Sequence, residues 1–171
     1  KDLSETNSMN IHFSWQASHQ PSLMKLEKLE LEQIIGETVH RNRMHYISLS
    51  LPHTYRELLA NGITEDYSMG YGSINGFRAS TCQPFAWYDL GRETETNLVI
   101  YPFAYMEANS IFEEKKTPEH ALASLQHFYE AVKAVQGHYI TIFHNHLIGK
   151  GADGRRWWQV YEHFLTLNFP A

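Results

Sequence analysis

The sequence predicts an α/β fold in a single domain, and three observations support this class. Apolar segments with the β-branched and aromatic residues of strands alternate with segments whose apolar residues recur at helical spacing. The chain has 171 residues, of which 43% are hydrophobic, and this is enough for one compact core. It contains no internal repeat. Strands that alternate with helices favour a parallel sheet with crossover helices.

Five strands are predicted from short apolar runs. The first shows period-two alternation, with Met9, Ile11 and Phe13 on one face. The last, YITIFHNH, is a β-branched and aromatic run that ends in a His-Asn-His sequence. The strands are expected at residues 9–14, 43–49, 63–69, 97–103 and 139–146.

Four helices are predicted between and after these strands. Gly36, Gly62 and Gly137 lie just past three of them, where glycine commonly ends a helix. Thr117 and Pro118 form a helix start, with threonine as the N-cap and proline at the first helical position. The helices are expected at residues 22–35, 52–61 and 118–136 and around 157–164.

The segment 70–89 is expected to be a long functional loop, because it is rich in glycine and aromatic residues. Polar side chains also share a face on three predicted strands, and histidines end the last strand. The carboxyl ends of parallel strands meet at one edge, where the ligand sites of such folds lie. We therefore expect one pocket lined by His12 and Ser14, Arg43 and His45, Asp66 and Ser68, and His144 with His146.

The charge balance and the hydropathy pattern exclude two classes of partner. The 19 acidic residues outnumber the 14 basic ones, and the resulting net charge of −5 is spread without long runs. We therefore expect no nucleic acid as a partner. No apolar run approaches the roughly 18 residues of a transmembrane helix, so no membrane span is expected. The single cysteine, Cys82, excludes an internal disulfide.

The order of five short motifs between residues 10 and 146 resembles the polysaccharide deacetylase family. This is carbohydrate esterase family four, of NodB-homology type, and the likeness is strongest to a bacterial branch with a GFRAGT-like loop. The motifs are His12-x-Ser14, Arg43-x-His45-Tyr46, Gly62-Ile63-x-x-Asp66, the loop that begins Gly76-Phe77-Arg78-Ala79-Ser80-Thr81, and Ile142-Phe143-His144-Asn145.

The resemblance implies a distorted (β/α) barrel that hydrolyses N- or O-acetyl groups on a carbohydrate polymer or oligosaccharide. It also implies a divalent metal, which would be zinc, cobalt or nickel. A closed barrel usually needs about 200 residues or more. Because this chain is shorter and begins directly at a strand, residues 1–171 are expected to be the C-terminal portion of one catalytic domain, without its first strand or strands.

The resemblance also implies roles for individual residues. His144 would be the general acid, Asp66 would support it, and Arg43 would orient a carboxylate. His12 would be a metal ligand, and His45 would substitute for the second ligand, because Gln16 stands where the family has its second histidine. An ordinary structural role stays open for both His144 and Asp66. The expected substrate-binding residues are Tyr46, Phe77, Arg78, Trp87 and His146.

The family's first motif, an Asp-Asp pair, has no counterpart here, since Asp2 lies in no matching context. Either the motif belongs to a segment that precedes this chain or catalysis has been lost. Two other functions remain open at this point. The chain could be a non-catalytic carbohydrate-binding domain that uses the aromatic loop from Phe77 to Tyr88. It could also be a different metal hydrolase, in which His144 and His146 act together as ligands.

Overall fold

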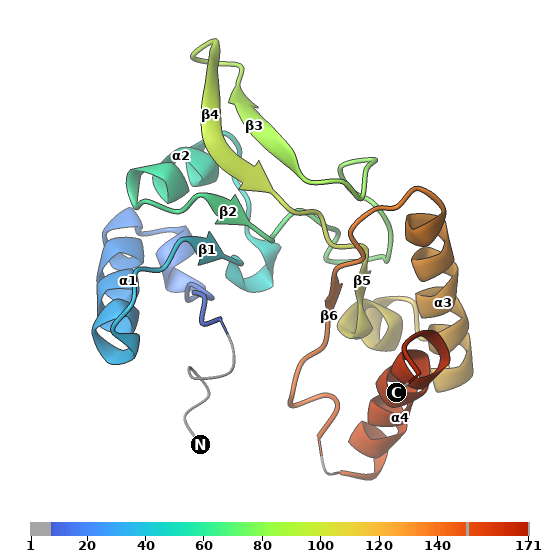
Figure 1. The fold of residues 1–171 in the computed structure, drawn as a ribbon. Helices are drawn as coiled ribbons and strands as arrows, with labels where there is room; N and C mark the ends of the chain where they lie inside the picture. The colour runs from blue at the N-terminus through green and yellow to red at the C-terminus, as the bar shows by residue number, and fades with distance from the viewer. Residues whose placement is uncertain (1–7, 150, 171) are drawn as a thin grey trace. The chain divides into compact units, whose positions relative to one another are not determined.

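The computed structural model describes residues 8–149 and 151–170, and the chain divides into two compact units (Figure 1). The first unit contains the chain up to Met69 together with Pro84–Tyr101. The second contains Gly70–Gln83 and the chain from Pro102 onward. Each unit has its own buried core, so the two are described separately below.

The first unit is built on a four-stranded sheet in the order β1-β2-β4-β3. Strands β1 (Arg41–Asn42), β2 (Glu65–Asp66) and β4 (Thr94–Ile100) are mutually parallel. Strand β3 (Phe85–Asp89) pairs with β4 in the antiparallel sense. Ile11 adds a single parallel bridge to Asn42 at the β1 edge. The predicted parallel arrangement is therefore present for β1, β2 and β4, in strands shorter than expected.

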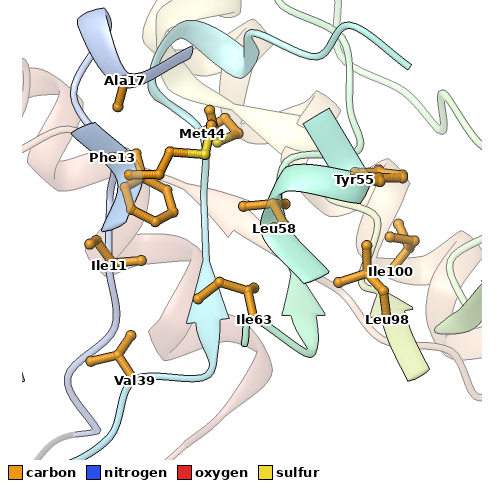
Figure 2. Close-up of a cluster of buried hydrophobic side chains, with 11 residues drawn as sticks. Ile11, Phe13, Ala17, Val39, Met44, Tyr55, Leu58, Ile63, Leu98 and Ile100 are labelled. Atoms are coloured by element: carbon orange, nitrogen blue, oxygen red, sulfur yellow. The ribbon is translucent and has the colours of Figure 1, made fainter. Parts of the chain in front are cut away.

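Two helices pack on this sheet, and both were predicted. Helix α1 (Pro21–Ile35) follows a short 3₁₀ turn at Gln16–Ser18 and ends at Gly36, whose φ of 72° is left-handed and suits glycine. Helix α2 spans His53–Ala60. The core beneath them is shown in Figure 2 and comprises Ile11, Phe13, Ala17, Met24, Val39, Met44, Tyr55, Leu58, Ile63, Leu98 and Ile100.

The prediction that segment 70–89 is one continuous loop was wrong at its C-terminal end. Residues 85–89 form β3, which joins β4 through a tight turn. Trp87 packs edge-on against Tyr55, with ring centroids 5.4 Å apart. Arg56 of α2 donates two hydrogen bonds of 2.7 Å to the buried carboxylate of Asp89. The alternation of larger side chains in Phe-Ala-Trp-Tyr-Asp was a strand signal that the preceding glycines obscured.

The strand predicted at residues 43–49 was also wrong. Strand β1 ends at Asn42, and the chain then turns through a 3₁₀ segment at His45–Ile47. Tyr46 and Ile47 have left-handed φ angles of 52° and 56°. The turn begins after Met44, which is buried and whose backbone N–H donates to the hydroxyl of Ser68 at 2.8 Å. This long-range contact replaces the strand pairing that the local sequence favours.

The second unit contains a parallel pair of two-residue strands and two long helices. Strands β5 (Tyr105–Met106) and β6 (Thr141–Ile142) pair directly, and a π-helix (Asn109–Glu113) follows β5. Helix α3 (Pro118–Ala134) begins at the predicted Thr117 cap, and helix α4 spans Ala152–Asn168. The buried core between these elements is formed by Tyr105, Ala121, Leu125, Val160 and Phe164. Strand β5 and the π-helix were not predicted.

The predicted α/β class is confirmed, but the strands do not close into a barrel within the described residues. They form the open four-stranded sheet of the first unit and the separate β5–β6 pair of the second. In residues 8–149 and 151–170, none of the helices has the length and apolar content that a membrane crossing requires.

Candidate functional site

His144 lies just after β6 and is held by Glu107, which follows β5. The parallel register pairs Met106 with Ile142, so the chain segments that leave the two strands run side by side. Nδ1 of His144 lies 2.9 Å from Oε1 of Glu107. The backbone N–H of His144 donates to the same oxygen. One carboxylate oxygen therefore fixes both the backbone and the ring of this histidine.

This contact determines which ring nitrogen of His144 can carry out chemistry. A carboxylate accepts hydrogen bonds, so the contact selects the tautomer with its proton on Nδ1. The other nitrogen, Nε2, then accepts a proton in the neutral ring and donates one in the charged ring. Glu107 is fully buried, whereas the His144 side chain is 37% exposed. His144 is thus an accessible imidazole with a buried anchor.

Glu107 carries a second feature of interest, because its Oε2 has no hydrogen-bond partner among the described residues. Buried polar atoms are nearly always satisfied by protein or ordered water, so such an atom marks a polar site. The sequence reasoning missed Glu107. The available signal was an acidic residue that ends the apolar run from Tyr101 to Met106. That signal was lost because the predicted strand ended near Pro102.

His146 lies beside His144 in the second unit. The two ring centroids are 5.5 Å apart and the rings meet at 63°, in an edge-to-face arrangement. Both residues were expected inside a strand. They lie instead in the turn that follows β6, and His146 is exposed. This turn therefore presents two neighbouring imidazoles.

In the first unit, the predicted metal ligands His12 and His45 do come together. Their ring centroids are 4.7 Å apart. Nδ1 of His12 lies 2.7 Å from the carbonyl oxygen of Arg43. The ring of Tyr46 lies against that of His45 at 4.5 Å, and Tyr46 is 77% exposed. The left-handed turn at Tyr46 thus brings two histidines and a tyrosine to one surface.

These residues do not supply a complete metal site. A catalytic zinc ion is usually held by three protein ligands. Within the described part of the chain, no group of three or more His, Cys, Asp or Glu side chains is placed to hold a metal ion. His12 contributes only Nε2, because its Nδ1 faces the Arg43 carbonyl. Asp2 lies outside the described residues.

Asp66 is fully buried, and its partners lie on the neighbouring strand and in its own loop. Oδ1 accepts hydrogen bonds from Asn42 at 2.8 Å and from the Ser68 hydroxyl at 2.7 Å, while Oδ2 accepts from the Ser68 backbone N–H at 3.0 Å. Burial raises the pKa of Asp66 to about 6, although these hydrogen bonds and the charge of Arg43 act in the opposite direction. Asp66 therefore ties β1 to β2, and the carboxylate found on His144 is that of Glu107.

Arg43 was expected to orient a carboxylate. Its Nε donates to the backbone carbonyl of Tyr67 at 3.1 Å, and its interaction with Asp66 is one of charge at longer range. Burial lowers the pKa of its guanidinium. Arg43 thus holds the loop after β2.

The three remaining residues predicted to bind substrate make packing or backbone contacts. Phe77 meets Phe128 edge-on, with ring centroids 5.7 Å apart. Arg78 donates to the carbonyl of Gly70 at 3.2 Å. Trp87 belongs to the first-unit core through its contact with Tyr55. Phe77 and Trp87 are partly exposed and Arg78 is exposed, so these contacts leave part of each side chain accessible.

The candidate residues thus fall into two groups, one in each unit. His12, His45 and Tyr46 gather on the first unit, and His144, His146 and Glu107 gather on the second. The second group combines an accessible imidazole with a buried carboxylate, the pairing that acid–base catalysis uses. No protein-family model, curated protein or solved structure matches this chain, so the contacts around His144 carry the functional argument that follows.

Proposed function

We propose that this chain is a hydrolase that removes acetyl groups from carbohydrate, with His144 as its general acid. One observation carries the proposal: the buried carboxylate of Glu107 holds both the backbone and Nδ1 of His144. Such a partner orients the ring and fixes its tautomer, as catalytic acids and bases require. The order of the sequence motifs that resemble polysaccharide deacetylases supplies the substrate class.

The proposed chemistry assigns a distinct task to each of these two residues. When water adds to an acetyl carbonyl, the departing amine or hydroxyl must gain a proton before it leaves. Nε2 of the charged His144 ring gives this proton, the attacking water loses a proton to the solvent, and Glu107 stays hydrogen-bonded to Nδ1 throughout. In the charged ring, the Glu107–His144 contact is an ion pair, which keeps the ring oriented while it donates the proton. His146, whose ring centroid lies 5.5 Å from that of His144, is a second imidazole beside it.

His12 and His45 provide two imidazoles, which is fewer than the usual three protein ligands, so no step of this proposal passes through a metal. A relation to the (β/α) barrel of the family is likewise proposed. It is supported by the parallel pairing of Ile11, β1, β2 and β4 in chain order, with α1 and α2 between successive strands.

The test measures acetate release from acetylated chito-oligosaccharides. The 171-residue chain is assayed with added zinc, cobalt or nickel and also with a chelator. We expect His144→Ala to reduce release about 10²- to 10⁴-fold, the usual contribution of a general acid. Glu107→Gln keeps the side-chain shape and should reduce release to a smaller degree. His127→Ala, on the outer surface of α3, is the matched control and should change nothing.

Two outcomes would refute the proposal. The first is the absence of acetate release by the folded chain under every metal condition. The second is full activity in His144→Ala, because a positioned general acid cannot be dispensable. A requirement for one of the added metals would extend the proposal to a metal-dependent reaction. The metal content of His12→Ala and His45→Ala would then be measured.

A non-catalytic carbohydrate-binding domain is the second candidate, and one observation favours it. Within residues 77–88, all of which the structure describes, Tyr88 is an exposed aromatic side chain at 40%, on the face of β3 that points away from the core. Sugars stack on such rings. Glycan binding that survives His144→Ala and a chelator, but is lost in Tyr88→Ala, would select this candidate over the hydrolase.

A further inference from the structure

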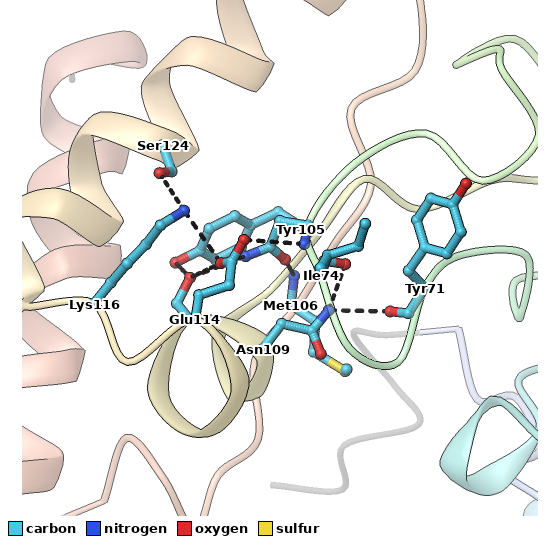
Figure 3. Close-up of polar contacts among 10 residues, drawn as sticks. Tyr71, Ile74, Tyr105, Met106, Asn109, Glu114, Lys116 and Ser124 are labelled. Carbon is cyan, nitrogen blue, oxygen red and sulfur yellow. Dashed lines mark hydrogen bonds and ion pairs between the residues drawn. The ribbon is translucent and has the colours of Figure 1, made fainter.

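In the second unit, side-chain hydrogen bonds connect the glycine-rich loop, residues 70–78, to the segment that carries Glu107 (Figure 3). Nδ2 of Asn109 donates to the carbonyl of Tyr71 at 3.0 Å and to that of Ile74 at 2.8 Å. Asn109 is buried and stands two residues after Glu107. A single side chain therefore attaches two backbone carbonyls of the loop to the start of the π-helix.

Asn75 makes the reciprocal attachment from the loop. Its Oδ1 accepts from the backbone N–H of Met106 at 2.8 Å, directly before Glu107. Its Nδ2 donates to the Ser110 hydroxyl at 2.9 Å and to the carboxylate of Glu114 at 2.8 Å. Asn75 is also buried. The backbone on both sides of Glu107 is thus held by side-chain amides, from Asn75 on one side and Asn109 on the other.

The same network continues to helix α3. The ammonium group of Lys116 lies 3.2 Å from Glu114 and donates to the Ser124 hydroxyl at 2.8 Å (Figure 3). At the other end of the loop, the backbone N–H of Gly76 donates to the carbonyl of Ala104 at 2.8 Å. These contacts connect the loop, β5, the π-helix and α3 into one hydrogen-bonded framework around Glu107.

We propose that Asn75 and Asn109 are positioning residues, which hold Glu107 where its carboxylate meets His144. Loop 70–78 is accordingly a fixed support for the Glu107–His144 pair, and its aromatic residues are secondary to that task. The catalytic consequence rests on the function proposed above, but the geometric consequence does not. Loss of either amide frees the backbone beside Glu107, and a displacement of about 1 Å at a catalytic group can cost 10²-fold in rate.

The experiment observes the His144 ring directly by NMR in the full chain, labelled with ¹⁵N at histidine. In the wild type, the proton on Nδ1 of His144 should give a downfield signal that exchanges slowly, because it is bonded to the buried Glu107. Asn75→Ala and Asn109→Ala should lose or broaden this signal. Ser110→Ala removes one partner of Asn75 and should accelerate the exchange to a smaller degree. This milder variant keeps the test valid if an alanine variant fails to fold.

The matched control is Asn168→Ala. Asn168 and Gln126 exchange two amide hydrogen bonds of 2.7 and 2.9 Å between α4 and α3 in the same unit. Its loss should lower the melting temperature but leave the His144 signal unchanged. In the acetate assay, Asn75→Ala and Asn109→Ala should lower kcat about 10- to 100-fold with little change in KM.

Two results would overturn the positioning role. One is a retained His144 signal in folded Asn75→Ala and Asn109→Ala, and the other is an equal loss of the signal in Asn168→Ala. The proposed function fails separately from this inference. If the wild type releases no acetate while the two asparagine variants still lose the His144 signal, the positioning role stands and the hydrolase proposal falls.

Discussion

Replacing Asp66 with Asn should abolish a pH dependence of stability that the buried carboxylate imposes on the first unit. Burial raises the pKa of Asp66 from 3.8 to about 6, so the folded state binds a proton that the unfolded state has already lost between these values. The contribution of Asp66 to the free energy of unfolding therefore falls as pH rises from about 4 to about 6, and it is constant above that range. At about 1.4 kcal/mol per pKa unit, a rise from 3.8 to about 6 amounts to about 3 kcal/mol.

Other carboxylates titrate in the same range, so the wild type and Asp66→Asn must be compared at each pH. Urea unfolding is measured at pH 4, 5, 6 and 7. Trp157→Phe and Trp158→Phe are built into both proteins, so that fluorescence reports on Trp15 and Trp87 of the first unit. The free energy of unfolding of the wild type relative to Asp66→Asn should fall by up to about 3 kcal/mol between pH 4 and pH 7.

Asp89→Asn is the matched control with the opposite sign. The hydrogen bonds from Arg56 lower the pKa of Asp89, so this group contributes stability above its ordinary pKa and loses it as the pH falls. The wild type should therefore gain relative to Asp89→Asn as pH rises from acid values. A difference between the wild type and Asp66→Asn that stays constant from pH 4 to pH 7, or that grows with pH, would refute the burial argument for Asp66.

Three further predictions concern stability and can be checked by urea unfolding. Leu58→Ala removes a fully buried side chain of α2 and should cost about 2–5 kcal/mol; a cost below 1 kcal/mol would contradict the described core. Thr117→Ala removes the N-cap of α3 and should cost about 1 kcal/mol, whereas Thr117→Ser should retain most of the stability; equal losses would argue against capping. Gly70→Ala would place a Cβ atom 2.2 Å from the buried Phe103 ring and should lower the free energy of unfolding by about 1–3 kcal/mol. Gly151→Ala, whose Cβ atom would have no neighbour within 4 Å among the described residues, should be nearly neutral. An unchanged free energy of unfolding in Gly70→Ala would contradict the described position of Phe103.

The helices were predictable because their signals are local. Gly36 ends α1, and Thr117 with Pro118 starts α3, as the sequence indicates. These residues act through backbone geometry within one turn of the helix, so no knowledge of distant contacts is needed. The four predicted helices therefore correspond to α1, α2, α3 and α4 in their position along the chain.

The strands were harder to predict because long-range pairing decides where each one ends. Residues 43–49 have strand-like composition, yet β1 stops at Asn42, where Met44 enters the core and bonds to Ser68. Strand β5, which was not predicted, is two residues long and exists through its pairing with β6. A segment of that length leaves no periodic signal in the sequence.

In the candidate site too, local sequence signals were readable and long-range contacts were not. His144 was proposed because it ends an apolar run, and the rings of His12 and His45, both proposed as metal ligands, lie 4.7 Å apart. Glu107 also ends an apolar run, but its contact with His144 was not predictable, since the two residues are 37 positions apart and meet through the β5–β6 register. Asp66 satisfied the same sequence pattern as a catalytic carboxylate, but its burial and its bonds to Asn42 and Ser68 give it a structural role.

The short π-helix after β5 carries Asn109 at its start and is followed by Glu114, and both side chains bond to the glycine-rich loop. A π-helix is wider than an α-helix by about one residue per turn, so deleting one residue between Asn109 and Glu113 would restore ordinary winding. In an α-helix each residue turns the chain by about 100°. Because a π-turn takes about one residue more than an α-turn, the shortened segment would still bring Glu114 to the side of Asn75. The extra residue of the π-helix therefore lengthens the segment between Asn109 and Glu114 without changing the side on which both meet the loop.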